Sequence, residues 1–416
     1  MINSIYPIKL FNNCLRNYKL DTYDSVRDFF TDSPFNYRFD DINGNGLYLI
    51  NYKNQSDIYE DDSTDYSGMG IALTSVMRGS IFEKGTNRLV CFPIPAFTPR
   101  SEFEQIPFER LEFTDAIDGV LVNLYFYDKM WRISTRGRVN AFHSYWRSER
   151  SFGEMAAEVL SGFDFSQLNR NYCYGLILEH SDHTNVIHHK NKRLYHIFTR
   201  DMNTLQEVDE ACIGIPKPRK HTFMSQAFLK VYLTNCKLRN CIGVVARDRW
   251  TNRRHVFYTN EYLRMKSLIK NHRDIHDIFI DTYTGIGDSV KNVRYILNHF
   301  KKYKTEWKWV LHTYTELIDY IEFYYDQCYK KKKQMEIPKV LKPVIYDIHG
   351  IYISRKREWY RIEQLRRLTE VYYRGDIESN PSPKIMRYDI IEWYASQPFE
   401  VRRKLLNDFS EEMVYM

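Results

Sequence analysis

The hydrophobic pattern of this sequence changes period near residue 261, and that change limits the fold more than any other feature. From about 45 to 260, short alternating or apolar runs are separated by turn residues, as in "GLYLINY", "VLVNLYFYDKMWRIST" and "CIGVVARDRWTNRRHVFYT". Alternation with a period of two is typical of strands that bury one face. Turn signals at Lys84-Gly85, Asp128-Lys129 and Thr251-Asn252 predict that several strands pair as antiparallel hairpins.

Helical patterns occupy two short stretches of this region and all of the region that follows it. Stretches at about 152–162 and 223–230 predict helices between the strands, so the expected class is α+β with an antiparallel β-rich core. Beyond residue 261 the apolar residues recur at helical spacing. We therefore expect one domain over 1–265 and a helical domain over 270–416. The proline-containing stretch "IPKVLKPVIYDIHG" (337–350) should separate the helical domain into two halves.

The amino-acid composition says more about where the protein works than about what it does. The 416 residues carry 60 Lys and Arg against 53 Asp and Glu, and a net charge of +7 permits nucleic-acid binding without requiring it. The seven cysteines form no CxxC pair, which argues against a zinc ribbon or a disulfide framework. No run approaches the ~20 apolar residues of a membrane-spanning helix. We expect an intracellular, cytoplasmic protein, with a large virus of AT-rich genome as one source compatible with the frequent Tyr, Asn, Ile and Lys residues.

Short motifs follow one another through the strand region. "SVMRGSIFEKGTNRLVCFPIPAF" (75–97) precedes "DAIDGVLVNLYFYDKMWRISTRGR" (115–138), and "YGLILEHSDHTNVI" (174–187) and "NCIGVVARD" (240–248) come next. Each motif is degenerate, but their order and spacing together resemble the bacteriophage-type RNA ligase 1 family of covalent nucleotidyltransferases. The resemblance covers roughly residues 70–265. It implies a ligase-like nucleotidyltransferase core followed by a C-terminal helical domain.

The resemblance also identifies what this sequence lacks. In the family, a lysine two residues before an Asp-Gly pair attacks the α-phosphate of ATP, and the matching residue here is Ala116. Ile177 and Ile242 match glutamates that hold the metal and the ribose, and Ala96 matches a lysine. Alanine cannot form a phosphoramide, and isoleucine can neither bind a cation nor accept a hydrogen bond. These degenerate positions predict a pseudoenzyme without adenylation activity.

Several polar positions of the motif series remain. Arg78, Asp118, Gly119, Arg136 and Arg138 match family positions near the nucleotide and the RNA phosphates, so the resemblance implies a retained phosphate-binding surface. The alternative is structural, because Asp-Gly forms good turns, glycine suits tight strand geometry and arginines are commonly solvated.

Five histidines between 180 and 196 raise the question of a metal site. His180 and His183 could approach a metal from one loop, with Asp182 as a carboxylate ligand. The neighbours His188 and His189 point to opposite faces of a strand, so they cannot share a site. We expect an exposed polar hairpin here and no metal site. The sequence contains no P-loop, no GxGxxG after a strand, no GxSxG and no HExxH, which removes the competing enzyme classes.

Three segments of the helical region, 299–309, 328–334 and 354–367, mix basic and aromatic residues. Lysine and arginine attract a phosphate backbone while Trp and Tyr stack on unpaired bases. Alternatively, the aromatic residues form a helical core and the charges are solvated. The candidate RNA-binding residues are Lys301, Lys302, Lys304, Trp307, Lys308, Trp309, Lys330, Lys331, Lys332, Lys333, Arg355, Lys356 and Arg357.

The leading hypothesis is a catalytically inactive RNA-ligase-like protein, retained for RNA binding or protein assembly and without a cofactor. One alternative is an active ATP-dependent RNA ligase or nucleotidyltransferase that uses ATP and magnesium, in which Ala116 is an engineered substitution or another lysine, such as Lys129 or Lys266, has taken over. The other is a structural viral assembly protein. Under the leading hypothesis, the degenerate positions should pack as ordinary core and leave no cavity able to hold ATP with its metal.

Overall fold

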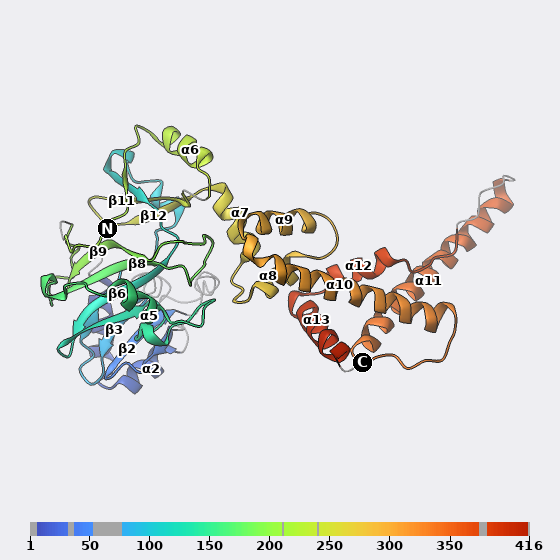
Figure 1. Ribbon diagram of the computed structural model, residues 1–416, viewed down its shortest axis with the longest axis horizontal. Coiled ribbons are helices and arrows are strands. Elements are labelled where there is room, and N and C mark those ends of the chain that lie inside the picture. The colour runs from blue at the N-terminus through green and yellow to red at the C-terminus, as the bar shows by residue number, and fades with distance from the viewer. Residues whose placement is uncertain are drawn as a thin grey trace. The chain divides into compact units, whose positions relative to one another are not determined.

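The computed structural model describes residues 6–31, 37–52, 77–209, 212–238, 241–373 and 381–414. The chain divides into two compact units, Met1–Lys266 and Ser267–Met416, which are described separately. The first unit contains three four-stranded sheets with antiparallel pairing, and the second is helical (Figure 1). The predicted α+β class, with antiparallel sheets and C-terminal helices, is confirmed.

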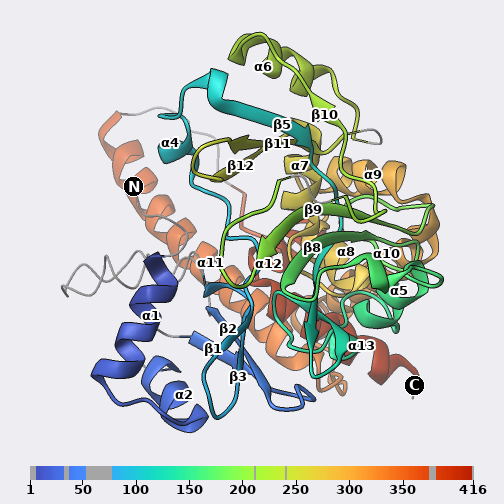
Figure 2. The same cartoon turned by 90° about the vertical axis from the view of Figure 1, so that its left-hand side faces the viewer.

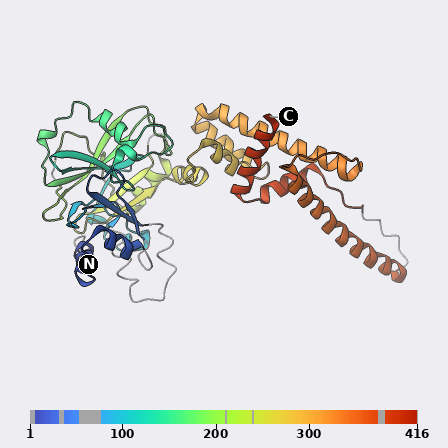
Figure 3. The ribbon, with the colours of Figure 1, turned by 90° about the horizontal axis from the view of Figure 1, so that it is seen from below.

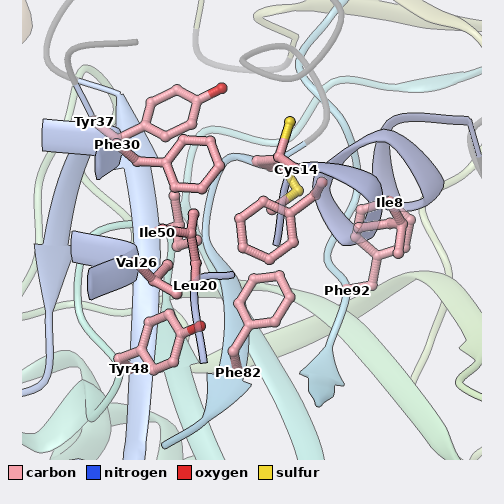
Figure 4. Close-up of a cluster of buried hydrophobic side chains, with 12 residues drawn as sticks. Ile8, Cys14, Leu20, Val26, Phe30, Tyr37, Tyr48, Ile50, Phe82 and Phe92 are labelled. Carbon is pink, nitrogen blue, oxygen red and sulfur yellow. The ribbon is translucent and has the colours of Figure 1, made fainter. Parts of the chain in front are cut away.

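The first sheet has the order β1-β2-β3-β4 and packs against two N-terminal helices. Its core is aromatic: the Phe30 ring packs with Tyr37, and the Tyr48 ring stacks on Phe82 at a centroid distance of 5.5 Å (Figure 4). The sequence analysis did not identify these helices. The elements are α1 (Tyr6–Asn17), α2 (Tyr23–Thr31), β1 (Tyr37–Asp40), β2 (Leu47–Tyr52), β3 (Ser80–Glu83) and β4 (Leu89–Cys91).

The second sheet has the order β7-β6-β8-β9 and is covered on one face by α5. Asp128 and Lys129 connect β6 to β7 with φ angles of 50° and 61°, which matches a two-residue turn with positive φ at both positions. The α5 helix starts at a reciprocal capping box between Ser151 and Glu154. The elements are β6 (Val120–Tyr127), β7 (Met130–Thr135), α5 (Phe152–Val159), β8 (Tyr172–Glu179) and β9 (Arg193–Asp201).

The third sheet has the order β10-β5-β11-β12 and carries α6 on one face (Figure 2). Phe113, Val244 and Ala246 are buried against Leu229 of α6 on that face. The elements are α4 (Arg100–Phe103), β5 (Leu111–Asp115), β10 (Lys220–His221), α6 (Gln226–Asn235), β11 (Gly243–Asp248) and β12 (Arg254–Tyr258). The three turns expected from the sequence are present, with Gly85 and Asn252 at φ 84° and 57° in the β3–β4 and β11–β12 hairpins.

The second unit is a set of packed helices that follows α7 (Asn260–Ile269) (Figure 3). The expected interruption over 337–350 is wrong for residues 341–350, because α11 begins at Leu341 and includes Pro343. Proline is tolerated in a first helical turn, where its missing N–H has no intrahelical acceptor. The helices are α8 (Ile275–Thr282), α9 (Ser289–His299), α10 (Lys304–Tyr325), α11 (Leu341–Tyr373), α12 (Arg387–Ser396) and α13 (Phe399–Val414).

Candidate functional site

A cavity of about 1030 Å³ is lined by residues of both the second and the third sheet in the first unit. Ligand pockets in proteins usually measure about 300–1,000 Å³, so this cavity can hold a nucleotide-sized molecule. Successive residues of a strand point to opposite faces of the sheet, so every second residue of a strand faces the cavity. Glu112 and Thr114 of β5 line the cavity, whereas Phe113 between them is buried on the α6 face.

Three of the four degenerate positions lie in the cavity lining, which contradicts the expectation of a filled core. Ala116 and Ile242 are 8% and 4% exposed, and Ile177 is half-buried; all three contribute to the lining. Ala96 is half-buried and stands outside the lining formed by the described residues. The space persists because each sheet is fixed by a separate core on its far face, so small side chains at the cavity do not let the sheets collapse together.

Asp118 is a buried anchor for the segment that follows β8. Its carboxylate accepts hydrogen bonds from the Asn185 side chain at 2.9 Å, from the backbone N–H groups of Val186 and Ile187 at 2.9 and 2.5 Å, and from the Tyr262 hydroxyl at 3.2 Å. Burial, reinforced by this carboxylate, raises the pKa of Tyr262. A Cβ at Gly119 would lie 2.5 Å from the Leu178 carbonyl oxygen, so the neighbouring strand requires glycine there. Both residues therefore line the cavity and also fix the backbone segments that form it.

The three arginines of the motif series separate into two groups. Arg78 and Arg136 both line the cavity. Their chain segments are in direct contact, because a Cβ at Gly79 (φ 80°) would come within 3.1 Å of the Arg136 Cα. Arg138, in contrast, donates to Asp40 at 2.6 Å, away from the lining.

Lysines reach the cavity from positions that the sequence analysis did not select. Lys217, Lys220 and Lys266 all belong to the lining, and of these only Lys266 was considered. Lys220 pairs across the strands with Thr114, two residues before Ala116 on the same strand face. Directly opposed side chains of antiparallel strands have Cβ atoms about 4.5–5.5 Å apart, so the exposed Lys220 side chain starts beside Thr114, two residues from Ala116. The basic run "KPRK" was the only sequence signal for this arrangement.

The acidic side chains of the lining already have partners. Glu207 is contacted by Arg254 at 2.9 and 2.6 Å, by Arg200 at 3.5 Å and by Arg247 at 3.5 Å. Burial alone would raise the pKa of the Glu207 carboxyl, but these arginines hold it below its usual value. Asp115 lies 2.6 Å from the His221 imidazole. The cavity therefore combines paired carboxylates with additional basic side chains and favours an anionic ligand.

The histidine-rich segment is not the exposed hairpin that the sequence suggested. His180, His183 and His196 are 0%, 3% and 2% exposed. Burial lowers the pKa of His183 to about 4 and that of His196 to about 4, so both imidazoles are neutral at pH 7. Their packing explains the error, because the His183 ring meets Phe152 of α5 edge-on at 5.0 Å. Within the described parts of the chain, no group of three or more His, Cys, Asp or Glu side chains is arranged to hold a metal ion.

The candidate RNA-binding residues of the second unit differ in their surroundings. The Trp307 ring packs against Phe279 at 5.4 Å and Tyr283 at 4.9 Å, and Trp309 stacks on His276 at 4.9 Å. The flanking lysines are exposed: Lys301, Lys302, Lys304 and Lys308 near α10, and Lys331, Lys332 and Lys333 after it.

Lys330 pairs with Asp326 at 2.6 Å, and Arg355 of α11 pairs with Asp389 at 2.6 Å. Lys356 lies near the rings of Tyr352 and Tyr360, and Arg357 is exposed. Aromatic rings and exposed bases therefore lie near one another both at the start of α10 and on α11.

Comparison with known proteins gives likeness of fold alone. No protein-family model and no curated protein matches the sequence. Among solved structures, the chain is similar to an archaeal ATP-dependent RNA ligase (11% identity, 66% of this chain and 74% of that one, TM-score 0.38) and to a candidate ATP-dependent DNA ligase from Aquifex aeolicus (11%, 68% and 79%, TM-score 0.37).

A variant of the Naegleria gruberi RNA ligase with ATP and manganese matches at 15% identity over 40% of this chain and 54% of that one, with a TM-score of 0.31. Because all of these TM-scores lie below 0.5, we draw no functional conclusion from them. No helix in the described ranges is long and apolar enough to span a membrane.

Proposed function

We propose that this protein is a ligase-like binding protein whose cavity takes a phosphorylated nucleoside, either a free nucleotide or the phosphorylated end of an RNA strand, without forming a covalent adduct. The observation that carries the proposal is the cavity itself, whose lining combines several basic side chains with Ala116, the residue that the sequence resemblance matches to a nucleophilic lysine. A phosphate group needs such charge to offset its desolvation. The order of the sequence motifs supports the same ligand class.

The cavity suits binding better than covalent chemistry. Ala116 offers no nucleophile, and Ile177 and Ile242 offer no oxygen ligand for a metal ion. The carboxylates of the lining are already engaged, Glu207 with Arg254 and Asp115 with His221. Positive charge is supplied by Arg78, Arg136 and Lys220, among others.

Isothermal titration calorimetry tests the proposal with three ligands: ATP with magnesium, a short RNA carrying a 5′-phosphate, and the same RNA with a 5′-hydroxyl. We expect micromolar binding of a phosphorylated ligand and much weaker binding of the hydroxyl form. Binding of ATP but not of RNA would identify a free nucleotide as the ligand. Absence of binding to both phosphorylated ligands would reject the proposal.

A matched pair of lysine variants connects binding to the cavity. Lys220→Ala should weaken binding about tenfold, because a charged hydrogen bond contributes roughly 1.5 kcal/mol. Lys129→Ala removes the same charge from the exposed β6–β7 turn and should change nothing. Equal effects of the two variants would show that binding depends on net charge rather than on the cavity.

The position of Lys220 also favours a second candidate function, a nucleotidyltransferase with a displaced nucleophile. Its amine would form a bond to the α-phosphorus of ATP as the bond to the β-phosphate oxygen breaks, with pyrophosphate leaving and the amine proton passing to water. Intact-protein mass spectrometry after incubation with ATP and magnesium decides between the two functions. A mass gain of one AMP that disappears in Lys220→Arg would establish the enzyme and overturn the non-covalent proposal.

For the RNA strand, we place the contact on the basic part of α11. Lys356 lies near the exposed Tyr360 ring, and Arg357 and Arg361 are exposed on the same helix, Arg361 beside Glu358. Replacing these three bases by glutamine should lower the affinity for fluorescent single-stranded RNA and reduce the slope of log affinity against log salt by about 2. The control replaces exposed bases of the first unit, Lys9, Arg16 and Lys129. If both triple variants bind alike, α11 is not the contact.

A further inference from the structure

The outer face of α6 is apolar and uncovered, although the inner face of the same helix already supplies a core. On the inner side, Leu229 is 3% exposed and packs with Phe113 and Val244. On the outer side, Phe228 and Val231 are 58% and 59% exposed. Figure 2 shows α6 at the periphery of its unit, beside β5 and β10. A surface helix normally presents polar residues opposite its buried stripe, so the apolar outer face requires an explanation.

The exposed apolar residues Met224, Ala227, Phe228 and Val231 lie in one short segment, the stripe. Phe228 and Val231 are three residues apart in α6 and therefore share a helix face, and Ala227 is exposed beside Phe228. Met224, 88% exposed, stands two residues before the helix, ahead of the extended Ser225.

Positive charge predominates around the stripe. Between Met224 and Leu238 the only charged side chains are Lys230 and Lys237, and both are exposed. Glu104, which interacts with Lys230 from the preceding helix, is itself paired with Arg100. A second copy of the same helix would bring the like charges of the lysines together. A partner helix with an apolar stripe and acidic flanks complements both the stripe and the lysines.

We infer that this outer face of α6, formed by Met224, Ala227, Phe228 and Val231, is a docking surface for an acidic amphipathic helix of a partner protein. It lies on the opposite face of the third sheet from the cavity, so it is separate from the proposed ligand site. The aliphatic and aromatic side chains supply the buried contact, and the lysines select the acidic partner.

Methionine-methyl NMR of the full-length protein tests this inference, because Met224 reports from the stripe itself. The probe is a synthetic helical peptide with Leu at i, i+4 and i+7 and Glu on both flanks. A second peptide has the same Leu stripe and Lys flanks. Met130, 54% exposed in the β6–β7 hairpin, serves as an internal control.

We expect the Glu-flanked peptide to shift the Met224 methyl signal and leave that of Met130 unchanged, and the Lys-flanked peptide to bind at least tenfold more weakly. Phe228→Ser and Val231→Ser, both at exposed positions, should abolish the shift while the circular dichroism spectrum stays unchanged. Equal shifts with both peptides, or no shift with either, would overturn the inference. A Met224 shift that appears on raising the protein concentration alone would instead assign the face to self-association.

Discussion

The cavity has two walls that differ in chemistry. The neutral wall, formed by Ala116, Ile177 and Ile242, carries no charged side chain. The charged wall, formed by Glu207, Arg247 and Arg254, holds a buried carboxylate among arginines. If the whole site had relaxed into an ordinary core, both walls would be neutral. Under the proposed function, the charged wall helps to hold the anionic ligand, while the neutral wall supplies no group for covalent catalysis.

The largest expected effect is on the charged wall. Glu207→Gln leaves the buried Arg254 and Arg200 without their carboxylate partner, whereas Arg247 keeps Asp209, and breaking such a cluster typically costs about 3–5 kcal/mol. Urea unfolding monitored by circular dichroism gives the change in unfolding free energy. Glu104→Gln, which breaks an exposed pair with Arg100, is the control and should cost less than about 1 kcal/mol. Similar losses in the two variants would show that the charged wall is not a coupled unit.

Acidification should lower the stability of the protein first through the buried imidazoles of the cavity lining and only later through the charged wall. His183 and His196 have folded-state pKa values of about 4, below the value of about 6.5 in an unfolded chain. The unfolded state therefore takes up protons first, and stability falls as the pH drops from about 6.5 to about 4, by roughly 2–3 kcal/mol per imidazole. His183→Gln should flatten part of this decline in a series of urea titrations. A constant unfolding free energy between pH 7 and 4.5 would contradict the account.

Glu207 should respond only at lower pH. Arginine contacts hold its folded-state pKa below the ordinary value, so its stabilising contribution is complete above the unfolded pKa and is lost as the pH falls through the lower folded value. Glu207→Gln should therefore lower the unfolding free energy by the same amount at pH 7 and at pH 5. A loss that vanishes already at pH 5 would mean that the carboxyl is protonated there.

A smaller effect is expected at Asp118, which joins the neutral wall to the segment after β8. Asp118→Asn keeps the shape of the side chain but replaces one acceptor oxygen by a donor that faces the N–H groups of Val186 and Ile187. A cost of about 1–3 kcal/mol follows from the unsatisfied donors. Differential scanning calorimetry measures it, with Asp128→Asn at the exposed hairpin turn as the control. Equal unfolding free energies for Asp118→Asn and Asp128→Asn would show that Asp118 acts only as a turn residue.

The sequence was sufficient for the features that depend on local pattern. The hairpin turns at Gly85, Lys129 and Asn252 follow from residue types that adopt positive φ. The class and the antiparallel pairing follow from the two hydrophobic periods.

Features that depend on tertiary packing were missed or wrong. The cavity persists because separate cores fix the sheets, which no local pattern reveals. Lys220 belongs to the two-residue strand β10, which pairs with β5 although the two strands are about 100 residues apart in the chain. The burial of His183 depends on α5, whose position over the sheet is equally non-local.

The central claim, an anion-binding cavity that contains Ala116, is tested most directly by calorimetric titration of ATP with magnesium into two proteins, the chain with Ala116 and the Ala116→Phe variant. The phenylalanine ring would project into the cavity from the neutral wall and leave the charged wall intact. We predict micromolar binding to the chain with Ala116, no detectable binding to the variant, and unfolding free energies that agree within about 1 kcal/mol. No binding to the chain with Ala116, or the same affinity in both proteins, would contradict the account.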